Sequence, residues 1–201
     1  MDIRYNFPID TSANQTNYYW FEEGFTKQEL DDIERLVAKL DFVRGSTQAE
    51  GGEFDTDNDY RKSSVKWVPF SDEYKWIYDK LGDMAYEANQ NMFHFDLHSM
   101  PEQIQYTEYY ASELGHYDWH MDIGFNDLSQ RKVSITVQLS DNTEYEGGNL
   151  QLWPGGNYPL EAPRGKGNVV IFPSFMMHRI APVTRGTRKS FVLWLGGGHY
   201  R

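Results

Sequence analysis

The second half of the sequence, from residue 103 onward, alternates short runs of β-branched and aromatic residues with turn-forming segments. The runs that predict strands are 103–110, 117–122, 131–139, 149–153, 168–172, 177–183 and 188–196. Glycine-rich turns separate several of these runs, as at 146–149, 153–157 and 164–168. Many short strands at this spacing favour a β-sandwich or barrel, and the jelly roll is prominent among such folds.

The first hundred residues show two helical patterns instead. A first helix is predicted after Thr26, which is followed three positions later by Glu29, as in a capping box. A second is predicted after Ser71, a residue type that often caps helices. Apolar residues follow both caps at helical period: Leu30, Ile33, Val37 and Leu40 in the first, and Tyr74, Ile77, Leu81, Met84 and Ala88 in the second. We therefore expect an α+β fold in one domain over 1–201. Helices within 1–100 would back a strand-rich core over 103–197, a β-sandwich or barrel among whose possible forms the jelly roll is prominent.

The segment 45–60, which lies between the two helical patterns, is glycine-rich and acidic and has no regular period. It predicts a long loop. Two interpretations of that loop remain open, a lid over a substrate and a disordered connection.

The overall composition limits the class of protein. The chain has 201 residues, no cysteine and a formal net charge of −11. Without cysteine there can be no disulfide and no thiolate zinc site. The acidic balance argues against a nucleic-acid partner, because phosphate contacts need clustered Lys and Arg. No stretch resembles a secretory signal or an apolar run that could cross a bilayer, so we expect a soluble, cytoplasmic protein without a membrane partner.

Two distant segments can supply the ligands of one metal ion. His120 and Asp122 stand two positions apart on a predicted strand, so their side chains would project to one face. His178 offers a second imidazole. Two histidines and a carboxylate on one face of the metal are the ligand set of non-haem Fe(II) oxygenases, and they leave coordination positions open.

Two of the predicted strands have polar faces that suit a cavity. In 131–139, one side carries Ser134, Thr136 and Gln138 and the other is aliphatic. In 188–196, one side carries Arg188, Ser190, Val192 and Trp194 and the other is apolar. Arginine stays protonated and can bond both oxygens of a carboxylate, so Arg188 with Ser190 would form an anion site.

Several motifs follow one another in order along this half of the chain. They are Tyr110-x6-Tyr117-x2-His120-x-Asp122, Arg131 with Ser134 and Leu139, YEGGNL at 145–150, GNVVIFPS at 167–174, and HRIAPVTRGTR at 178–188. Through this series, the stretch from about 103 to 196 resembles the prolyl 4-hydroxylase branch of the 2-oxoglutarate/Fe(II) dioxygenases. That branch includes the bacterial and phage PKHD-type hydroxylases.

The resemblance implies a double-stranded β-helix (jelly-roll, cupin-like) core over 103–197, and with it a set of site residues. It implies His120, Asp122 and His178 as iron ligands, and Arg188 as the partner of the C5 carboxylate of 2-oxoglutarate. It further implies that the cavity is lined by Tyr117 and by Tyr110, which would lie near the co-substrate. Arg61, Trp67 and Trp194 would lie on the substrate side.

Two positions depart from parts of the family. Gln138 stands where several prolyl hydroxylases carry a tyrosine that contacts the C5 carboxylate, so that contact would come from an amide. Arg188 stands where collagen-type enzymes use lysine, which moves the chain toward the oxygen-sensor and PKHD types. Ser190, on the same strand face as Arg188, is expected to complete the site for 2-oxoglutarate.

The resemblance implies a dioxygenase that needs Fe(II), 2-oxoglutarate and O2, with ascorbate as a supporting reductant. Its reaction would hydroxylate prolyl residues of a protein or peptide and convert 2-oxoglutarate to succinate and CO2. Two alternatives stay open: the same chemistry on a free amino acid or other small molecule, and a jelly-roll binding protein without turnover. The sequence leaves open the target, the oxidised carbon, the oligomeric state and a bacterial or viral origin.

Overall fold

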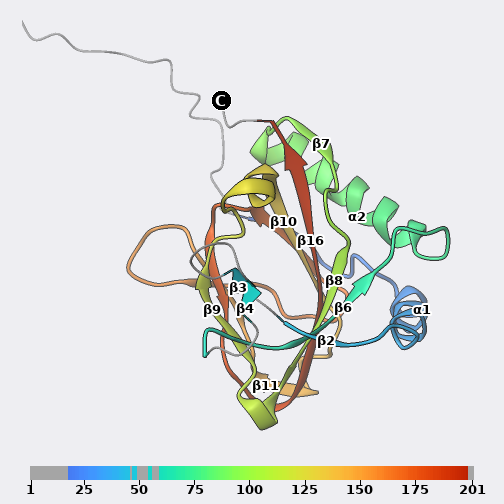
Figure 1. The fold of residues 1–201 in the computed structure, drawn as a ribbon, viewed down its shortest axis with the longest axis vertical. Coiled ribbons are helices and arrows are strands. Elements are labelled where there is room, and N and C mark those ends of the chain that lie inside the picture. Colours follow the sequence, from blue (N-terminus) through green and yellow to red (C-terminus); the bar gives the residue numbers. More distant parts are fainter. Residues whose placement is uncertain (1–17, 46, 49–53, 56–58, 199–201) are drawn as a thin grey trace, which may run out of the picture.

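Two antiparallel β-sheets dominate the computed structural model, which describes residues 18–45, 47–48, 54–55 and 59–198 (Figure 1). The larger sheet has nine strands. Seven follow one another in the order β1 (Tyr19–Phe21), β14 (Val169–Pro173), β10 (Arg131–Gln138), β16 (Val183–Gly197), β8 (Ile104–Tyr110), β6 (Ser64–Val68) and β2 (Val43–Arg44). The other two, β7 (Leu97–Ser99) and β11 (Tyr145–Gly147), pair with β16. The smaller sheet has five, in the order β13 (Leu160–Glu161), β12 (Leu150–Trp153), β15 (Met177–Ile180), β9 (His116–His120) and β5 (Arg61–Lys62). These two facing sheets confirm the predicted double-stranded β-helix.

The predicted loop 45–60 falls mostly outside the described residues, which leave out 46, 49–53 and 56–58. Its described parts include β3 (Thr47–Gln48) and β4 (Phe54–Asp55), which pair antiparallel as a separate two-stranded sheet. Whether this segment acts as a lid stays a prediction.

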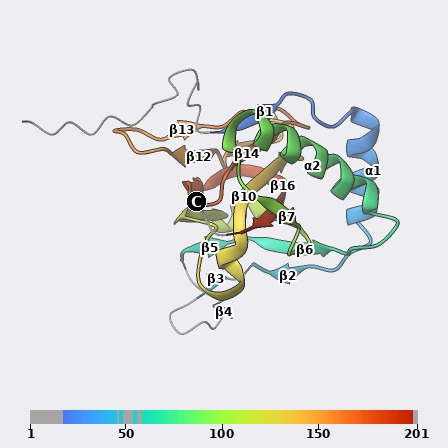
Figure 2. The ribbon, with the colours of Figure 1, turned by 90° about the horizontal axis from the view of Figure 1, so that it is seen from above.

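Both long helices cover the same face of the larger sheet (Figures 1 and 2). Helix α1 (Lys27–Val37) begins with the predicted capping box, in which the backbone N–H of Glu29 donates to the Thr26 hydroxyl and the backbone N–H of Thr26 donates to the Glu29 carboxylate. Its buried residues Leu30, Ile33 and Val37 are those of the predicted apolar stripe.

Helix α2 (Lys75–Ala88) begins four residues after the predicted cap, Ser71. Tyr74 occupies the N-cap without a side-chain hydrogen bond, and its backbone N–H donates to the carbonyl of Ser71 at 3.0 Å. Ser71 therefore starts a preceding turn rather than the helix, and its role as cap was predicted wrongly. After Ala88 the chain continues as a π-helical turn, Asn89–Phe93.

Strand β16 is a single 15-residue strand, although the sequence predicts a break within it. Its residues 183–186 pair with β11, and its later residues pair with β8, β10 and β7. Gly186 makes this possible because it adopts a φ of 70°, and a Cβ there would lie 2.0 Å from the carbonyl oxygen of Glu144. Gly186 thus holds a positive φ within one continuous strand, where the sequence predicted two separate strands.

The predicted division of strand faces is confirmed. Val133, Ile135 and Val137 of β10 pack beneath the helices with Phe191, Leu193 and Leu195 of β16. The polar faces of the same strands point between the two sheets, where Ser134, Thr136, Gln138, Arg188 and Ser190 are all buried. The larger sheet is therefore apolar toward the helices and polar toward the inside of the jelly roll.

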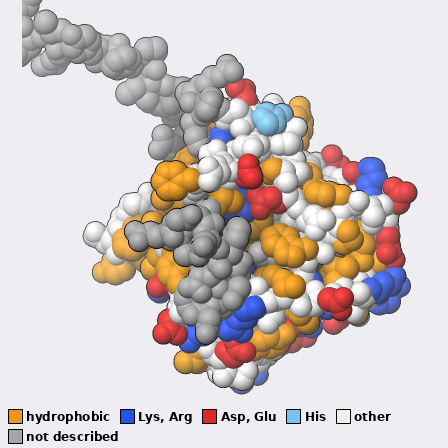
Figure 3. All heavy atoms as spheres, viewed as in Figure 1, with side chains coloured by type: hydrophobic (Ala, Val, Ile, Leu, Met, Phe, Trp, Pro, Cys, Tyr) orange, Lys and Arg blue, Asp and Glu red, His pale blue; other side chains and the backbone are white. Residues whose placement is uncertain are grey.

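The visible surface has no single chemical character. On the face shown in Figure 3, hydrophobic side chains form several separate groups, with acidic and basic side chains between them. Exposed large side chains include Phe42, Trp67 and Phe70. Among the helices that the structure describes, none is long and apolar enough to cross a bilayer.

Candidate metal centre and cavity

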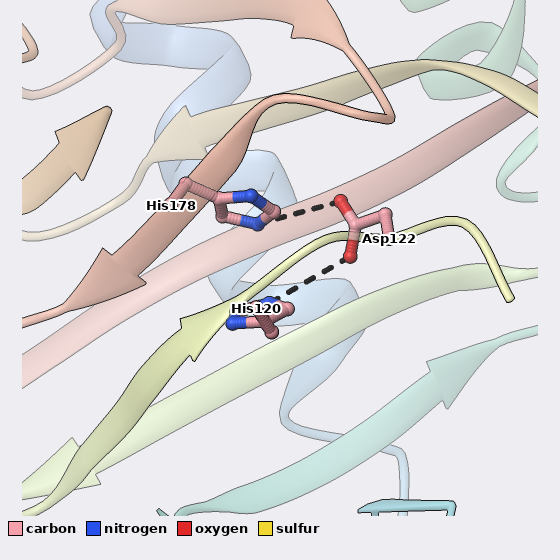
Figure 4. Close-up of side chains that lie close together, drawn as sticks. All are labelled: His120, Asp122 and His178. Carbon is pink, nitrogen blue, oxygen red and sulfur yellow. Dashed lines mark ion pairs between the residues drawn. The ribbon is translucent and has the colours of Figure 1, made fainter. Parts of the chain in front are cut away.

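The structure brings together the three predicted metal ligands, as Figure 4 shows. His120 ends β9 and His178 lies on the adjacent β15, where the two are direct partners in the antiparallel ladder. Asp122 follows β9 in a loop rather than on the strand, and its backbone N–H donates to the carbonyl of Ser174 at 2.9 Å. The Nε2 atom of His120 is 3.7 Å from Oδ1 of Asp122, and that of His178 is 3.4 Å from Oδ2.

Backbone carbonyls fix the orientation of both imidazoles. Nδ1 of His120 lies 2.7 Å from the carbonyl oxygen of Asp118, and Nδ1 of His178 lies 2.8 Å from that of Met176. A carbonyl only accepts, so each Nδ1 carries a proton and each Nε2 keeps its lone pair for a metal. Asp122 is held as well, because the Ser134 hydroxyl donates to its Oδ2 at 2.6 Å.

The charge states of these groups suit a cation. Burial and the neighbouring His178 lower the pKa of His120 to about 3, so this imidazole is neutral at ordinary pH. Burial alone would raise the pKa of Asp122. The charges of His178, His120 and Arg131 and the hydrogen bond from Ser134 outweigh burial and lower that pKa to about 2. A neutral imidazole and an ionised carboxylate are the protonation states that bind metals.

Arg188 supplies a buried cation beside this centre. It is 1% exposed, and it donates from Nη1 to Ser190 at 3.1 Å and from Nη2 to the amide oxygen of Gln138 at 3.0 Å. Within the described ranges no carboxylate pairs with Arg188, and its Nε has no hydrogen-bond partner. Burial lowers the pKa of Arg188, but an arginine still stays protonated at neutral pH. A buried cation with neutral partners is a site for an anion.

A cavity of about 270 Å³ lies between the two sheets and reaches the metal centre. The predicted site residues in its wall are Arg61, Trp67, Tyr117, His120, Asp122, His178, Ser190 and Trp194. Arg188 lies behind this wall and donates to Ser190 in it, and Gln138 accepts a hydrogen bond from Arg188. The cavity therefore joins the three candidate ligands to the candidate anion site.

Tyr110 is placed elsewhere, and its neighbour Tyr109 takes the predicted position. Alternate residues of a strand face opposite sides, and on β8 the residue that pairs with Arg188 is Tyr109. Tyr109 is buried, lines the cavity and lies under the Arg188 guanidinium, 5.6 Å from ring centre to Cζ. The hydroxyl of Tyr110 instead donates to Glu108 on the other face. Counting in twos along the strand from Ile104 and Tyr106, which pack under the helices, would have predicted this.

Tyr117 lies against the candidate ligand His120, and Arg61 lies against Tyr117. The Tyr117 ring stacks on the His120 ring with centroids 3.5 Å apart, and the Arg61 guanidinium lies 4.7 Å from the centre of the Tyr117 ring. Arg61 is 6% exposed, whereas Trp67 at the edge of the cavity is 40% exposed. The structure thus places both residues in the cavity wall, and their contact with a substrate stays a prediction.

A partly buried ion pair in the cavity wall was not predicted from the sequence as part of the site. Arg131 donates from Nε to the Glu102 carboxylate at 2.6 Å and also from Nη2, and its Nη1 donates to the backbone carbonyl of Asp122 at 3.2 Å. The guanidinium also lies over the Trp194 ring, 3.7 Å from its centre. The sequence gives no spacing signal for this pair, because the two residues come from different segments that only the fold brings together.

This fold and site define a class of protein: a double-stranded β-helix whose cavity offers two imidazole nitrogens, one carboxylate and a nearby buried arginine. The three ligands fit Fe(II), which binds imidazole and carboxylate well. The unpaired cation fits the far carboxylate of a dicarboxylic acid.

Comparison with known proteins agrees with this class. The family model of the 2OG-Fe(II) oxygenase superfamily matches residues 104–196. A PKHD-type hydroxylase of Synechococcus sp. (strain CC9605) is 39% identical over 79 residues, which are 39% of this chain and 36% of that protein. A PKHD-type hydroxylase of Nitrosomonas europaea is 32% identical over 116 residues, 53% of this chain and 50% of that protein. Residues 104–196 thus carry the match to the 2OG-Fe(II) oxygenase superfamily, and both of these relatives are PKHD-type hydroxylases.

Solved structures share the fold at low sequence identity. A prolyl hydroxylase from Trichoplax adhaerens, solved with a peptide fragment of the hypoxia inducible factor oxygen degradation domain, has a TM-score of 0.74 at 16% identity, covering 92% of this chain and 85% of that one. A Pseudomonas putida prolyl-4-hydroxylase has a TM-score of 0.65 at 18% identity, covering 92% and 95%. At the level of sequence, the matches to the PKHD-type proteins above span between 36% and 50% of those relatives' own length.

Proposed function

We propose that this protein is a 2-oxoglutarate- and Fe(II)-dependent dioxygenase that hydroxylates prolyl residues in a protein or peptide. One observation carries the proposal. The three convergent candidate ligands line one cavity, and the buried Arg188, which has only neutral partners, lies directly behind its wall and donates to the lining residue Ser190. This arrangement supplies a place for a metal ion and a place for the far carboxylate of a keto acid at once.

In this reaction the chain's own residues would bind and orient the reactants. Nε2 of His120, Nε2 of His178 and the Asp122 carboxylate would hold Fe(II), which when bound supplies the oxidation that sends one oxygen of O2 to succinate and the other to the substrate. Arg188, with Ser190 and Gln138, would bind the C5 carboxylate of 2-oxoglutarate. Ascorbate would act only as an external reductant.

Two tyrosines would donate hydrogen bonds within the cavity. Burial raises the pKa of Tyr109 and of Tyr117, so both phenols keep their protons. Tyr109 lies beside Arg188 and would contact 2-oxoglutarate, which is the role that the resemblance implied for Tyr110. The aliphatic residues Leu150 and Ile180 line the same cavity and limit the access of water.

The cavity wall favours a residue within a chain over a free amino acid. Trp194 and Leu128 supply ring and aliphatic surfaces, which suit the uncharged ring of a prolyl residue. Arg131 and Glu102 in the same wall already neutralise each other. A free amino acid would bring an ammonium and a carboxylate that both need partners, whereas a prolyl residue in a peptide brings neither. The likeness to the Trichoplax prolyl hydroxylase solved with a peptide supports the same choice.

The test is a turnover assay with a panel of proline-containing peptides. Purified protein with Fe(II), ascorbate and 2-oxoglutarate should release succinate and add the mass of one oxygen atom to a peptide. His120→Ala should abolish both, whereas His98→Ala, a change at an exposed histidine on β7, should leave both unchanged. Stimulation by free proline but by no peptide would select the small-molecule alternative. No binding of 2-oxoglutarate in the presence of Mn(II) would refute the proposal and leave the binding-protein alternative.

A further inference from the structure

Arg131 touches both the metal centre and the substrate-side wall of the cavity. Its side chain is 10% exposed, at the start of β10. One nitrogen, Nη1, donates to the backbone carbonyl of Asp122, while Nε and Nη2 hold the two carboxylate oxygens of Glu102. The flat guanidinium also covers the Trp194 ring. A single side chain therefore fixes a ligand's backbone, an acidic side chain and an indole.

Asp122 needs such support because it is the candidate ligand that does not lie on a strand. His120 and His178 are held by the β9–β15 ladder, but Asp122 comes after the end of β9. Three contacts fix it: the Ser134 hydroxyl on its carboxylate, the Ser174 carbonyl on its N–H, and Nη1 of Arg131 on its own carbonyl. Of these three contacts, only the one from Arg131 is made by a charged side chain.

Glu102 determines where the guanidinium of Arg131 sits. It lies in the segment before β8, and its side chain is 28% exposed. The two-point contact fixes the plane of the guanidinium, so that the remaining nitrogen Nη1 points at Asp122. A lysine could supply the charge but not three directed donors in one plane.

We propose that Arg131 is a positioning residue for Asp122, and that Glu102 holds Arg131 in the orientation that this task requires. The inference rests on the proposed function, since it concerns how tightly the centre binds its metal. Groups that orient a ligand without touching the metal commonly change metal affinity by about 10- to 100-fold when they are altered.

The test is Mn(II) binding to the metal-free protein, measured by electron paramagnetic resonance of the free ion. Arg131→Gln should weaken Mn(II) binding by about 10- to 100-fold. Arg131→Lys should not restore Mn(II) binding, because lysine brings back the positive charge but not the planar set of directed donors. Glu102→Gln should weaken binding in the same direction by a smaller factor, and the double variant should resemble Arg131→Gln alone. Arg185→Gln, which removes an exposed pair with Glu146 from β16, is the control and should bind Mn(II) as the unaltered protein does.

Thermal unfolding of the same metal-free variants separates positioning from general stability. A lower Tm with unchanged Mn(II) affinity in Arg131→Gln would overturn the inference, as would full recovery of affinity in Arg131→Lys. If Arg131→Gln does not fold, the Mn(II) affinity of Glu102→Gln is the deciding measurement. An unchanged affinity in that variant would overturn the inference. Failure of the unaltered protein to bind Mn(II) would instead refute the proposed function itself.

Discussion

His120 and His178 are direct partners across strands β9 and β15, with ring centroids 4.1 Å apart. Each Nδ1 contacts the carbonyl oxygen of the residue two positions earlier, Asp118 in one strand and Met176 in the other. The same local arrangement thus occurs twice, and both Nε2 atoms are directed at Asp122. The backbone ladder sets this geometry, so the candidate metal centre is preformed in the fold.

Removing Arg188 should affect 2-oxoglutarate far more than the metal. Arg188→Ala should raise the Kd for 2-oxoglutarate by about 100-fold, because a buried charge-assisted pair is lost. Mn(II) affinity should stay the same, since Arg188 contacts none of the three candidate ligands in the hydrogen bonds described for it. Isothermal titration with each ligand measures the two constants. Arg185→Ala on the same strand is the control, and an equal loss of both affinities in Arg188→Ala would show that Arg188 supports the fold instead.

Tyr109 and Tyr110 should behave differently although they are adjacent. Tyr109→Phe should raise the 2-oxoglutarate requirement by about 3- to 10-fold, the cost of one neutral hydrogen bond. Tyr110→Phe should leave that requirement unchanged, because its hydroxyl contacts Glu108 away from the cavity. Steady-state succinate release at varied 2-oxoglutarate measures both. The reverse order of effects would mean that strand β8 has the opposite face toward the cavity.

Stability of the metal-free protein should fall as the pH is lowered. The folded-state pKa of His120 is about 3, below its ordinary value of 6.5, so between these values the unfolded chain binds the additional proton. This group alone contributes a slope of up to about 1.4 kcal/mol per pH unit, with stability lost as the pH falls below about 6.5. Asp122, whose pKa is lowered to about 2, adds a further loss below its ordinary 3.8.

Urea unfolding at several pH values measures that slope. His120→Gln should flatten it by about the contribution of one proton, whereas His98→Gln, at an exposed position, should not. The same slope in His120→Gln as in the unaltered protein would contradict the neutral, buried state of this imidazole.

Gly186 should be required at its positive-φ position in β16. Gly186→Ala places a Cβ 2.0 Å from the Glu144 carbonyl oxygen at a φ of 70°, and should destabilise the protein by about 1–3 kcal/mol. Gly156→Ala, where a Cβ meets nothing within 4 Å, should have little effect. Chemical denaturation of the two variants makes the comparison, and equal stabilities would contradict the proposed role of Gly186.

The sequence predicted those features that depend on local period. Alternation in twos gave the polar and apolar faces of β10 and β16, and helical period with a capping box gave α1. The spacing of His120 and Asp122 placed two candidate ligands together, and the motif around His178 added the third. In each case the information lies within a few neighbouring residues.

Features that depend on contacts between distant segments were missed. The true start of α2 and the continuity of β16 depend on how turns pack, not on residue type alone. The Glu102–Arg131 pair forms only when the segment before β8 meets the start of β10. The prediction of Tyr110 in place of Tyr109 had a different, local cause: it followed the family motif and not the alternation of faces along the strand.

Anomalous diffraction from crystals grown with Mn(II) and 2-oxoglutarate tests the central claim most directly. One manganese peak is expected within about 2.0–2.3 Å of Nε2 of His120, Nε2 of His178 and a carboxylate oxygen of Asp122. The far carboxylate of 2-oxoglutarate is expected at Arg188. A manganese ion bound elsewhere, or held by fewer than these three residues, would contradict the account.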